Sequence, residues 1–485
     1  MHTSTTLALA GLLGSAAAET IHGVVVFSRH GDRTTKHYGN QTLTALGARQ
    51  CFQVGGDYRA RYLAADSPHR IRGISEFDYV PAQIWASAPD QGILLDTATS
   101  FLQGLYPPLG DIQPAAAAEK LANSSSVTSP LSGYQYVTLH GVVNDSPETI
   151  WIKGDDGCPV LDDASADFKA SPEYKSRLAA TRDFYRSLYP LVPSFYDSVD
   201  NLSYAKAYDI FDVINVENIH NAASPARKVT PDQLFQLRTL ADSAEFGLNF
   251  NASQPARSIH AATLAGSILN HLNQTAVAAT TPKAKAAPIF TLLAGSYDTL
   301  LAFFGLTNLT ATSPDFFGLP DYASTMSFEL FSTADDDASP AASDLRVRYL
   351  FRNGTAGTLR SFPLFGSGKA DLPWGEFVEL MGQRAITTTE AWCGVCNSDV
   401  DFCAAYQSEG VDVKSGSGSG VSRGSWIAVL VVMAVAIVGN LVWAGMWLAG
   451  RRKKAGEAAA AVAVSTAGPV KRVNSEPSSV GKESV

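Results

Sequence analysis

The residues with the clearest chemical potential lie in the segment Ser28-Arg29-His30-Gly31-Asp32-Arg33-Thr34. Two arginines flank a histidine, and a guanidinium is a planar, permanently charged fork of donors that matches phosphate oxygens. Positive neighbours disfavour the protonated imidazole, so His30 is expected to stay neutral and nucleophilic in acid. Gly31 lets the backbone turn sharply. A charged surface turn is the alternative, but the segment follows a hydrophobic run directly, which favours a phosphate-binding site with a nucleophile.

The elements that must position this segment follow an alternating pattern. Uninterrupted apolar runs at 22–28 and 288–294 predict buried strands, and 83–87 predicts another. Helical patterns cover 42–62, 94–105, 173–188, 263–273 and 299–304. This order predicts an α/β fold with a parallel sheet covered by helices, and a mostly helical insertion at about 111–280 between core segments 19–110 and 281–407. Ligands of such sheets bind beyond the carboxyl ends of the strands, so the chemistry is expected there.

Arg29-His30-Gly31-Asp32-Arg33 resembles the Arg-His-Gly-x-Arg signature of the histidine acid phosphatases, branch two of the histidine phosphatase, phosphoglycerate-mutase-like superfamily. The similarity continues through 101–107, 268–272 and the segment around Asp298, as in a divergent, fungal-type, membrane-anchored member. The resemblance implies that His30 attacks phosphate to form a phosphohistidine, which water then hydrolyses. It implies that Arg29 and Arg33 bind the phosphoryl oxygens and that Asp298 protonates the leaving group. No metal or other cofactor is implied, because the arginines supply the electrostatic stabilisation.

Two positions depart from the pattern of this family. Where the family has His-Asp, this chain has Tyr297-Asp298, and Gln91 stands where a third phosphate-binding arginine is expected. A tyrosine hydroxyl donates one hydrogen bond but carries no positive charge. Losing one donor to a transition state costs about 2.7–4 kcal/mol, or about 10²–10³ in rate. Activity is therefore expected to be weak, unless Lys36, His37 or His260 compensates.

Both ends of the chain predict passage through the secretory pathway. Residues 1–18 contain a short apolar run that ends in Ala16-Ala17-Ala18, which favours a cleaved signal peptide over a buried helix. Residues 408–425 predict a Gly/Ser-rich stalk, and the apolar stretch 426–449 is long enough to cross a bilayer. The basic residues that follow predict a cytoplasmic, disordered tail at 450–485. We expect a single-pass protein of the plasma membrane or another endomembrane, with its ectodomain, 19–407, outside.

Cysteines and sequons agree with an oxidising compartment. Five cysteines predict two disulfides and one leftover thiol, with the pairing open. Cys393-x2-Cys396 favours a disulfide clip over half of a zinc site, since no second ligand pair accompanies it. Eight Asn-x-Ser/Thr sites precede the predicted span and are candidate glycosylation sites: Asn40, Asn123, Asn144, Asn201, Asn251, Asn273, Asn308 and Asn353. The cysteines are Cys51, Cys158, Cys393, Cys396 and Cys403.

The net charge of the chain limits the classes of molecule that it is expected to bind. The net charge is −9, made up of +4 from residue 451 onward and −13 before it, which argues against a nucleic-acid binder. The expected partners are a phosphorylated small molecule or macromolecule and, through one helix, a membrane; the oligomeric state stays open.

The main hypothesis is a cell-surface acid phosphatase with reduced activity. A catalytically inactive, phosphatase-derived module that binds a phosphorylated ligand is the alternative, and a purely structural glycoprotein leaves Arg29, His30 and Arg33 unexplained. Glu329, on an expected strand, is interpreted as structural.

Overall fold

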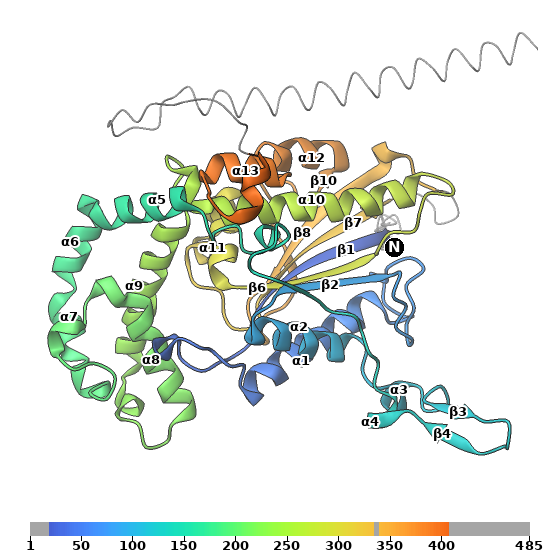
Figure 1. Cartoon of the computed structure of the whole chain (residues 1–485), viewed down its shortest axis with the longest axis horizontal. Helices are drawn as coiled ribbons and strands as arrows, with labels where there is room; N and C mark the ends of the chain where they lie inside the picture. Colours follow the sequence, from blue (N-terminus) through green and yellow to red (C-terminus); the bar gives the residue numbers. More distant parts are fainter. Residues whose placement is uncertain (1–18, 334–338, 407–485) are drawn as a thin grey trace, which may run out of the picture. The chain divides into compact units, whose positions relative to one another are not determined.

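The structure is a computed structural model of the chain that describes residues 19–333 and 339–406. Its centre is one large sheet with the strand order β10-β8-β7-β1-β6-β2-β5, and β9 pairs with β8. The strands are β1 (Thr20–Arg29), β2 (Ile84–Pro89), β5 (His140–Val142), β6 (Phe290–Gly295), β7 (Thr325–Ser332), β8 (Leu345–Arg352), β9 (Arg360–Ser361) and β10 (Leu372–Pro373). Figure 1 shows this sheet between layers of helices.

The sheet is mixed, which corrects the expectation of a parallel sheet. The strands β1, β6, β2 and β5 are parallel, as predicted. However, β7 runs antiparallel to β1, and β8, β9 and β10 extend the sheet with further antiparallel pairs. The short sequence between β7 and β8 allows this hairpin-like connection, whereas parallel neighbours need a longer crossover. The parallel half carries the predicted site segments.

Helices cover both faces of the sheet because the central strands are apolar on both sides. Val24 and Val26 of β1 pack with α1 (Ala45–Tyr62) and α2 (Gly92–Leu105). Val25 and Phe27 point to the other face and pack with α10 (Ile259–Thr280) and α11 (Tyr297–Leu306), and α12 (Trp374–Gly382) lies on the same face. This alternation is the period of two that a strand imposes. The last described helix is α13 (Thr389–Cys396).

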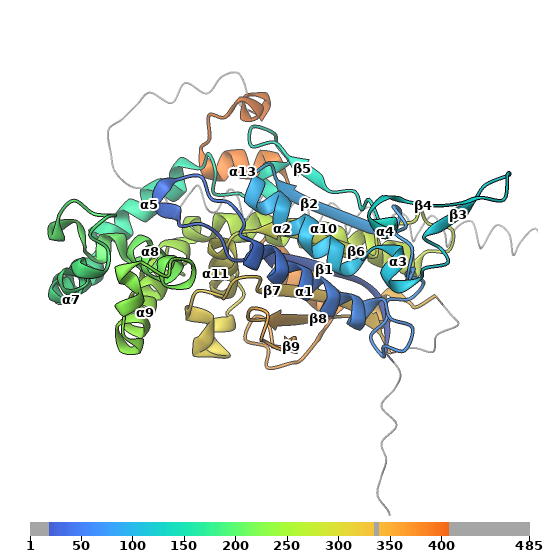
Figure 2. The same cartoon turned by 90° about the horizontal axis from the view of Figure 1, so that it is seen from below.

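A second group of helices stands beside the carboxyl ends of the parallel strands (Figures 1 and 2). It comprises α5 (Pro159–Ala170), α6 (Pro172–Ala180), α7 (Arg182–Ser187), α8 (Ala207–His220) and α9 (Pro231–Asn249). These helices share a separate apolar core that includes Tyr185, Ile210 and Leu237. The group therefore presents polar side chains of its inner helices to the edge of the sheet where the chemistry is expected.

The helical group is shorter than the predicted insertion at 111–280. At its start, β5 joins the main sheet, and at its end, α10 packs on the sheet. The residues between α2 and β5 form α3 (Leu109–Ile112), α4 (Pro130–Gly133) and a projecting hairpin of β3 (Ala118–Lys120) and β4 (Ser126–Thr128). The sequence pattern did not predict these short strands, because three-residue segments in a polar, turn-rich stretch show no clear periodicity.

The cysteines form two disulfides, Cys158–Cys396 and Cys393–Cys403, and Cys51 is free and buried. The prediction of two disulfides and one thiol is confirmed, and the structure supplies the pairing. Cys158–Cys396 links the start of α5 to the end of α13 and closes a long loop of chain, which restricts the unfolded state.

The predicted membrane topology falls mostly outside the described residues. Within 19–333 and 339–406, no helix is both long and apolar enough to cross a bilayer. The predicted signal peptide, stalk, span at 426–449 and tail all lie outside these ranges. Of the eight sequon asparagines, all are exposed except Asn251, which is half-buried, so the surface can accept glycans at these positions.

Candidate active site

The carboxyl ends of β1, β6 and β2 meet at one edge of the sheet. In the parallel pairing of β1 with β6, Arg29 lies opposite Gly295. The backbone N–H of His30 donates to the carbonyl of Gly295 at 3.3 Å. Tyr297 and Asp298 follow Gly295 in the first turn of α11. The structure therefore brings the backbone of the His30 segment next to the segment after the later strand.

His30 is held with one ring nitrogen engaged and the other free. Its Nδ1 lies 2.8 Å from the carbonyl oxygen of Gly31, which can only accept, so Nδ1 carries the proton. No hydrogen bond engages Nε2 among the described residues, so its lone pair is available for attack. Burial lowers the pKa of His30 well below 6.5, and Arg29, Arg33 and Lys36 lower it further, although the Gly31 carbonyl raises it. The ring is therefore a neutral imidazole whose Nε2 has no hydrogen-bond partner among the described residues.

Arg29 presents its guanidinium to this histidine from the end of β1. Its Nη1 donates to the carbonyl of Pro320, and its Nε is buried without a hydrogen-bond partner in the described part of the chain. The guanidinium lies 4.7 Å from the ring centre of Tyr322 and 5.1 Å from that of Tyr297, as cations do over aromatic faces. Arg29 also lines a cavity of about 300 Å³. Within residues 19–333 and 339–406 no carboxylate forms an ion pair with Arg29, so its charge is available to an anion.

Arg33 is differently placed from the expectation. It is fully buried, and its Nη1 lies 3.0 Å from Oδ1 of Asp212, which comes from α8 in the helical group. Its Nη2 donates to the hydroxyl of Tyr208 at 3.0 Å, and Nη1 also donates to the carbonyl of Thr34. Burial alone would lower the pKa of Arg33, but Tyr208 and Asp212 raise it above its ordinary value. Among the described residues, Nε is the nitrogen of Arg33 left without a partner, so Arg33 has fewer free donors for an anion than Arg29.

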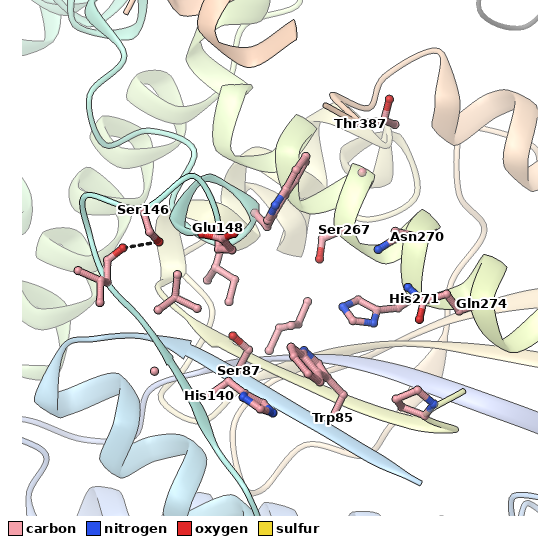
Figure 3. Close-up of a pocket in the computed structure, with 18 residues that line it drawn as sticks. Trp85, Ser87, His140, Ser146, Glu148, Ser267, Asn270, His271, Gln274 and Thr387 are labelled. Carbon is pink, nitrogen blue, oxygen red and sulfur yellow. Dashed lines mark hydrogen bonds between the residues drawn. The ribbon is translucent and has the colours of Figure 1, made fainter. Parts of the chain in front are cut away.

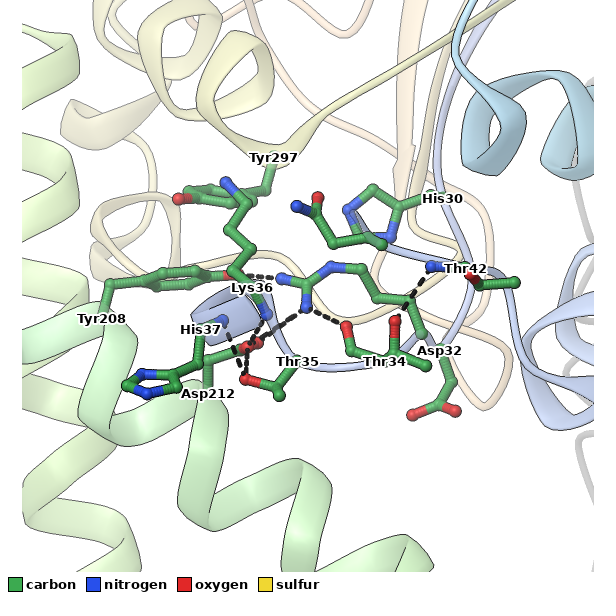
Figure 4. Close-up of polar contacts among 12 residues, drawn as sticks. His30, Asp32, Thr34, Thr35, Lys36, His37, Thr42, Tyr208, Asp212 and Tyr297 are labelled. Carbon is green, nitrogen blue, oxygen red and sulfur yellow. Dashed lines mark hydrogen bonds and ion pairs between the residues drawn. The ribbon is translucent and has the colours of Figure 1, made fainter. Parts of the chain in front are cut away.

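The Asp212 carboxylate holds the whole loop after β1. Besides Arg33, it accepts from the Thr35 hydroxyl at 2.9 Å and from the backbone N–H of Lys36 at 2.7 Å (Figure 4). Asp212 is 2% exposed. The ion pair therefore joins the helical group to the site loop and fixes the loop's conformation.

Tyr297 directs its hydroxyl away from the histidine. The hydroxyl donates to Oε2 of Glu245 at 2.8 Å, and the ring stacks on Tyr208 with 4.7 Å between centres. The Nζ of Lys36 lies 4.9 Å from the centre of the Tyr297 ring, and Figure 4 shows the lysine extended alongside it. Burial raises the pKa of Tyr297 well above 10, and Glu245 raises it further, so the group is a neutral phenol. In this arrangement the residue supplies a ring face and no donor to a phosphate.

Lys36 is the compensation candidate whose ammonium lies near His30. Its ammonium is near enough to His30 to lower the pKa of the imidazole. It forms no direct ion pair in the described ranges, but it is close enough to Glu245 to oppose the rise that burial causes in the pKa of that carboxyl. The other two candidates are engaged elsewhere. The Nδ1 of His37 lies 3.2 Å from Oδ2 of Asp209, and the Nε2 of His260 donates to the backbone carbonyl of Asp298.

Asp298 lies in the first turn of α11 in a charged setting. Its Oδ1 accepts from the backbone N–H of Thr299 at 2.8 Å. The carboxyl group of Asp155 is close enough to interact with it, and burial raises the pKa of Asp155, with Asp298 adding to the rise and His260 opposing it. Lys153 also interacts with Asp298. Asp298 is partly buried, and its other carboxylate oxygen makes no hydrogen bond to the described residues.

Gln91 lies at the third strand end, just after β2, and is the residue before α2. Its side chain makes no capping hydrogen bond and is half-buried. β2 is the neighbour of β6, so Gln91 occupies the same edge of the sheet as His30 and Tyr297. It supplies an amide where a charge would strengthen anion binding.

Glu329 is structural, as interpreted from the sequence. It is fully buried in β7 and accepts from Arg61 at 2.7 Å, from Tyr62 at 2.7 Å and from Arg348 at 2.8 Å. Burial would raise the pKa of Glu329, but the two arginines lower it below its ordinary value. Across the described ranges, no group of three His, Cys, Asp or Glu side chains is placed to hold a metal ion.

Sequence reasoning missed Asp212, Tyr208 and Tyr322. Asp212 gives one signal: it is a lone carboxylate in the apolar run Ile210-Phe211-Asp212-Val213-Ile214, and an ionised group in such a setting needs a partner. The partner itself could not be named, because 179 residues separate Asp212 from Arg33. Tyr322 follows the long loop after α11 and carries no pattern of its own.

The fold and the site together define a histidine phosphatase: a mixed sheet with an appended helical group, and a neutral imidazole between basic side chains at the strand ends. The family profile described as "Histidine phosphatase superfamily (branch 2)" matches residues 37–352. The chain belongs to this superfamily. The matched range begins after Arg33, so the membership and the Arg29-to-Arg33 motif are separate observations.

Individual relatives are distant. Lysosomal acid phosphatase of Xenopus laevis is 23% identical over 240 residues, a match that spans 47% of this chain and only about half, 49%, of that protein. Among solved structures, the apo phytase of Hafnia alvei has a TM-score of 0.51 at 15% identity, and covers 77% of this chain and 98% of its own. The phytase of Klebsiella sp. ASR1 has a TM-score of 0.51 at 14% identity, with 77% and 96% covered. These structures show the shared fold.

Proposed function

We propose that this protein is a phosphate monoester hydrolase that works through a phosphohistidine at His30, with a reduced rate. The observation that carries the proposal is the His30 geometry: Nδ1 is held by the Gly31 carbonyl, and burial between cations keeps Nε2 unprotonated. Membership of the histidine phosphatase superfamily supports it, as does the similarity to an acid phosphatase.

The reaction runs in two steps. Nε2 of His30 attacks the phosphorus atom, a P–N bond forms, and the P–O bond to the leaving alcohol breaks. Asp298 gives its proton to the departing oxygen, so the first step needs a protonated carboxyl group and favours acidic pH. Asp298 then takes a proton from water as the water oxygen attacks phosphorus, which releases phosphate and restores His30. Arg29 and Lys36 stabilise the charge on the phosphoryl oxygens.

Three features of the site support a reduced rate. Asp212 neutralises Arg33, the Tyr297 hydroxyl points to Glu245, and Gln91 has no charge. Each missing charged donor costs about 10²–10³ in rate, although groups that act together are not additive. The same features favour the second candidate, an inactive module that binds a phosphorylated ligand through Arg29 and Lys36.

A phosphatase assay separates the two. The full chain is tested on p-nitrophenyl phosphate at pH 4–6 beside His30→Ala, and the proposal predicts phosphate release by the wild type alone. Equal background rates in both proteins overturn it. The variant Tyr297→His with Gln91→Arg then measures the deficit: a large rise in rate supports the reduced activity, and no change from a healthy rate refutes it.

The substrate class follows from the chemistry of the site, which selects the phosphoryl group and leaves the alcohol open. A phytase of Hafnia alvei with the same fold has been solved with myo-inositol hexakis sulphate, a polyanionic ligand. The predicted membrane span and the sequons support a location at the cell surface or inside a secretory compartment, and we propose that the activity resides there. The phosphorylated partner is then a small molecule or macromolecule on that side of the membrane.

A further inference from the structure

We propose that a second cavity, separate from the phosphate site, binds a neutral carbohydrate. The cavity measures about 560 Å³, within the range of small-molecule sites. It lies between α10 on one side and β2 with β5 on the other, and η2 (Thr149–Trp151) contributes to its wall. Neither His30 nor Asp298 lines it, so it is distinct from the candidate active site.

The charge of the cavity excludes a phosphorylated or other anionic ligand. Its lining residues include no lysine and no arginine, and Glu148 is the one carboxylate among them. Burial lowers the pKa of His271 to about 4, so this imidazole is neutral above pH 5. An anion would lose hydration here and find no lysine or arginine in the lining to pair with, which is unfavourable.

Unpartnered polar groups exclude a purely apolar ligand. Ser87 and Ser267 are 5% and 8% exposed, and in the part of the chain that the structure describes their hydroxyls make no hydrogen bond. The side-chain amides of Asn270 and Gln274 are also without partners there. Figure 3 shows that α10 carries Ser267, Asn270 and Gln274 on the side of the cavity opposite Ser87. A ligand with hydroxyl groups on opposite sides would satisfy them, whereas a hydrocarbon would leave them unpaired.

The aromatic wall favours a sugar ring among neutral polar ligands. Trp85 stacks on His140 with 4.0 Å between ring centres and a 17° interplanar angle, which holds the indole in one orientation. Trp151 lines the cavity as well. The ring of His271 is tilted against Trp85 with 6.3 Å between ring centres, so the part of the indole that faces the cavity offers an apolar edge and partial face for the C–H groups of a pyranose. The amides and hydroxyls opposite can then reach its O–H groups. This combination of a rigid aromatic wall and neutral hydrogen-bonding groups fits a neutral mono- or disaccharide.

Calorimetric titration of the full chain tests the proposal, in a detergent without a sugar headgroup. The probes are maltose, cellobiose, mannobiose and chitobiose, and at least one is expected to bind saturably. Trp85→Ala should weaken that binding at least tenfold, and Gln274→Ala about fivefold, the effect of one hydrogen bond. Gln236→Ala removes an equally exposed helical amide from α9, far in sequence from the cavity, and should leave the affinity unchanged.

The controls distinguish this site from the phosphate site. His30→Ala should bind the sugar with the affinity of the wild type, and inorganic phosphate should not compete. Because Gln274 is exposed, its variant is informative even if Trp85→Ala does not fold. Absence of binding for all four sugars overturns the proposal, and so does binding that Gln274→Ala and Gln236→Ala weaken equally.

Discussion

Arg33 and Asp212 form an ion pair of 3.0 Å in which both side chains are buried, and it joins the loop after β1 to α8 of the helical group. The pair fixes the site loop and at the same time withdraws charge from it. Arg33, the residue expected to hold phosphate, thus also links the site loop to α8. Among the described site residues, Arg29 and Lys36 form no direct ion pair, although Lys36 interacts with the Glu245 carboxyl at longer range.

Removing the carboxylate of this pair is expected to destabilise the protein strongly. Asp212→Asn leaves Arg33 buried without a counter-charge and should lower the free energy of unfolding by about 3–5 kcal/mol. Urea denaturation followed by circular dichroism measures the change. Glu173→Gln breaks an exposed pair with Arg177 on α6 and should cost at most about 0.5 kcal/mol. Equal losses in the two variants would show that the buried pair is not a structural link.

The imidazole of His30 is expected to titrate well below pH 6.5, because burial and then Arg29 and Arg33 disfavour its protonation. NMR of ¹³C-labelled histidine follows the ring signal, and His30→Gln assigns it. The urea-unfolded chain, in which histidine titrates near 6.5, serves as the reference. A midpoint at or above 6.5 in the folded protein would contradict the neutral nucleophile.

The lowered pKa of His30 also determines how its contribution to the free energy of unfolding changes with pH. Below pH 6.5 the unfolded chain binds a proton at His30 and the folded chain does not, until the pH reaches the depressed folded pKa. Across that window the unfolded state binds more protons, so the contribution of His30 to the free energy of unfolding falls as the pH falls. His30→Gln should therefore show a shallower loss of stability over this window than the wild type. An unchanged slope would refute the linkage.

The hydroxyl of Tyr297 is expected to matter for stability and not for catalysis. Tyr297→Phe removes its hydrogen bond to Glu245 and leaves a half-buried acceptor without this donor, at a cost of about 1 kcal/mol. Phosphate release should stay within about twofold, since this hydroxyl points away from His30. Tyr349→Phe is the matched control: the Tyr349 hydroxyl is buried without a partner within the described ranges, so its removal should be neutral. A large fall in rate for Tyr297→Phe would assign the hydroxyl to phosphate binding.

Lys36 is expected to carry catalytic charge. Lys36→Gln should lower kcat/KM by about 10- to 100-fold, the effect of one hydrogen bond to a charged group, and Lys36→Arg should restore much of it. Lys175→Gln on α6 removes an exposed lysine distant from the site and should leave the rate unchanged. Steady-state kinetics on p-nitrophenyl phosphate makes the comparison. If Lys36→Gln and Lys175→Gln have the same kcat/KM, Lys36 does not contribute to catalysis and Arg29 acts without it.

The parallel strands and the meeting of His30 with the Tyr297 segment were predictable because each strand is an uninterrupted apolar run followed by polar residues. The antiparallel half of the sheet was not, since β7 and β8 can pair in either direction on pattern alone. The state of Arg33 was also beyond prediction: it depends on Asp212, which the packing of α8 brings to the loop from a distant part of the chain. Similarly, no local pattern indicates that Glu245 draws the Tyr297 hydroxyl aside.

Trapping the covalent intermediate tests the central claim most directly. The full chain is mixed with ³²P-labelled p-nitrophenyl phosphate at pH 5, quenched in alkali, where phosphohistidine survives, and digested for mass spectrometry. The account predicts label on the peptide that contains His30, in wild type and not in His30→Ala. Phosphate release by the wild type with no label on that peptide, or equal label in His30→Ala, would contradict it.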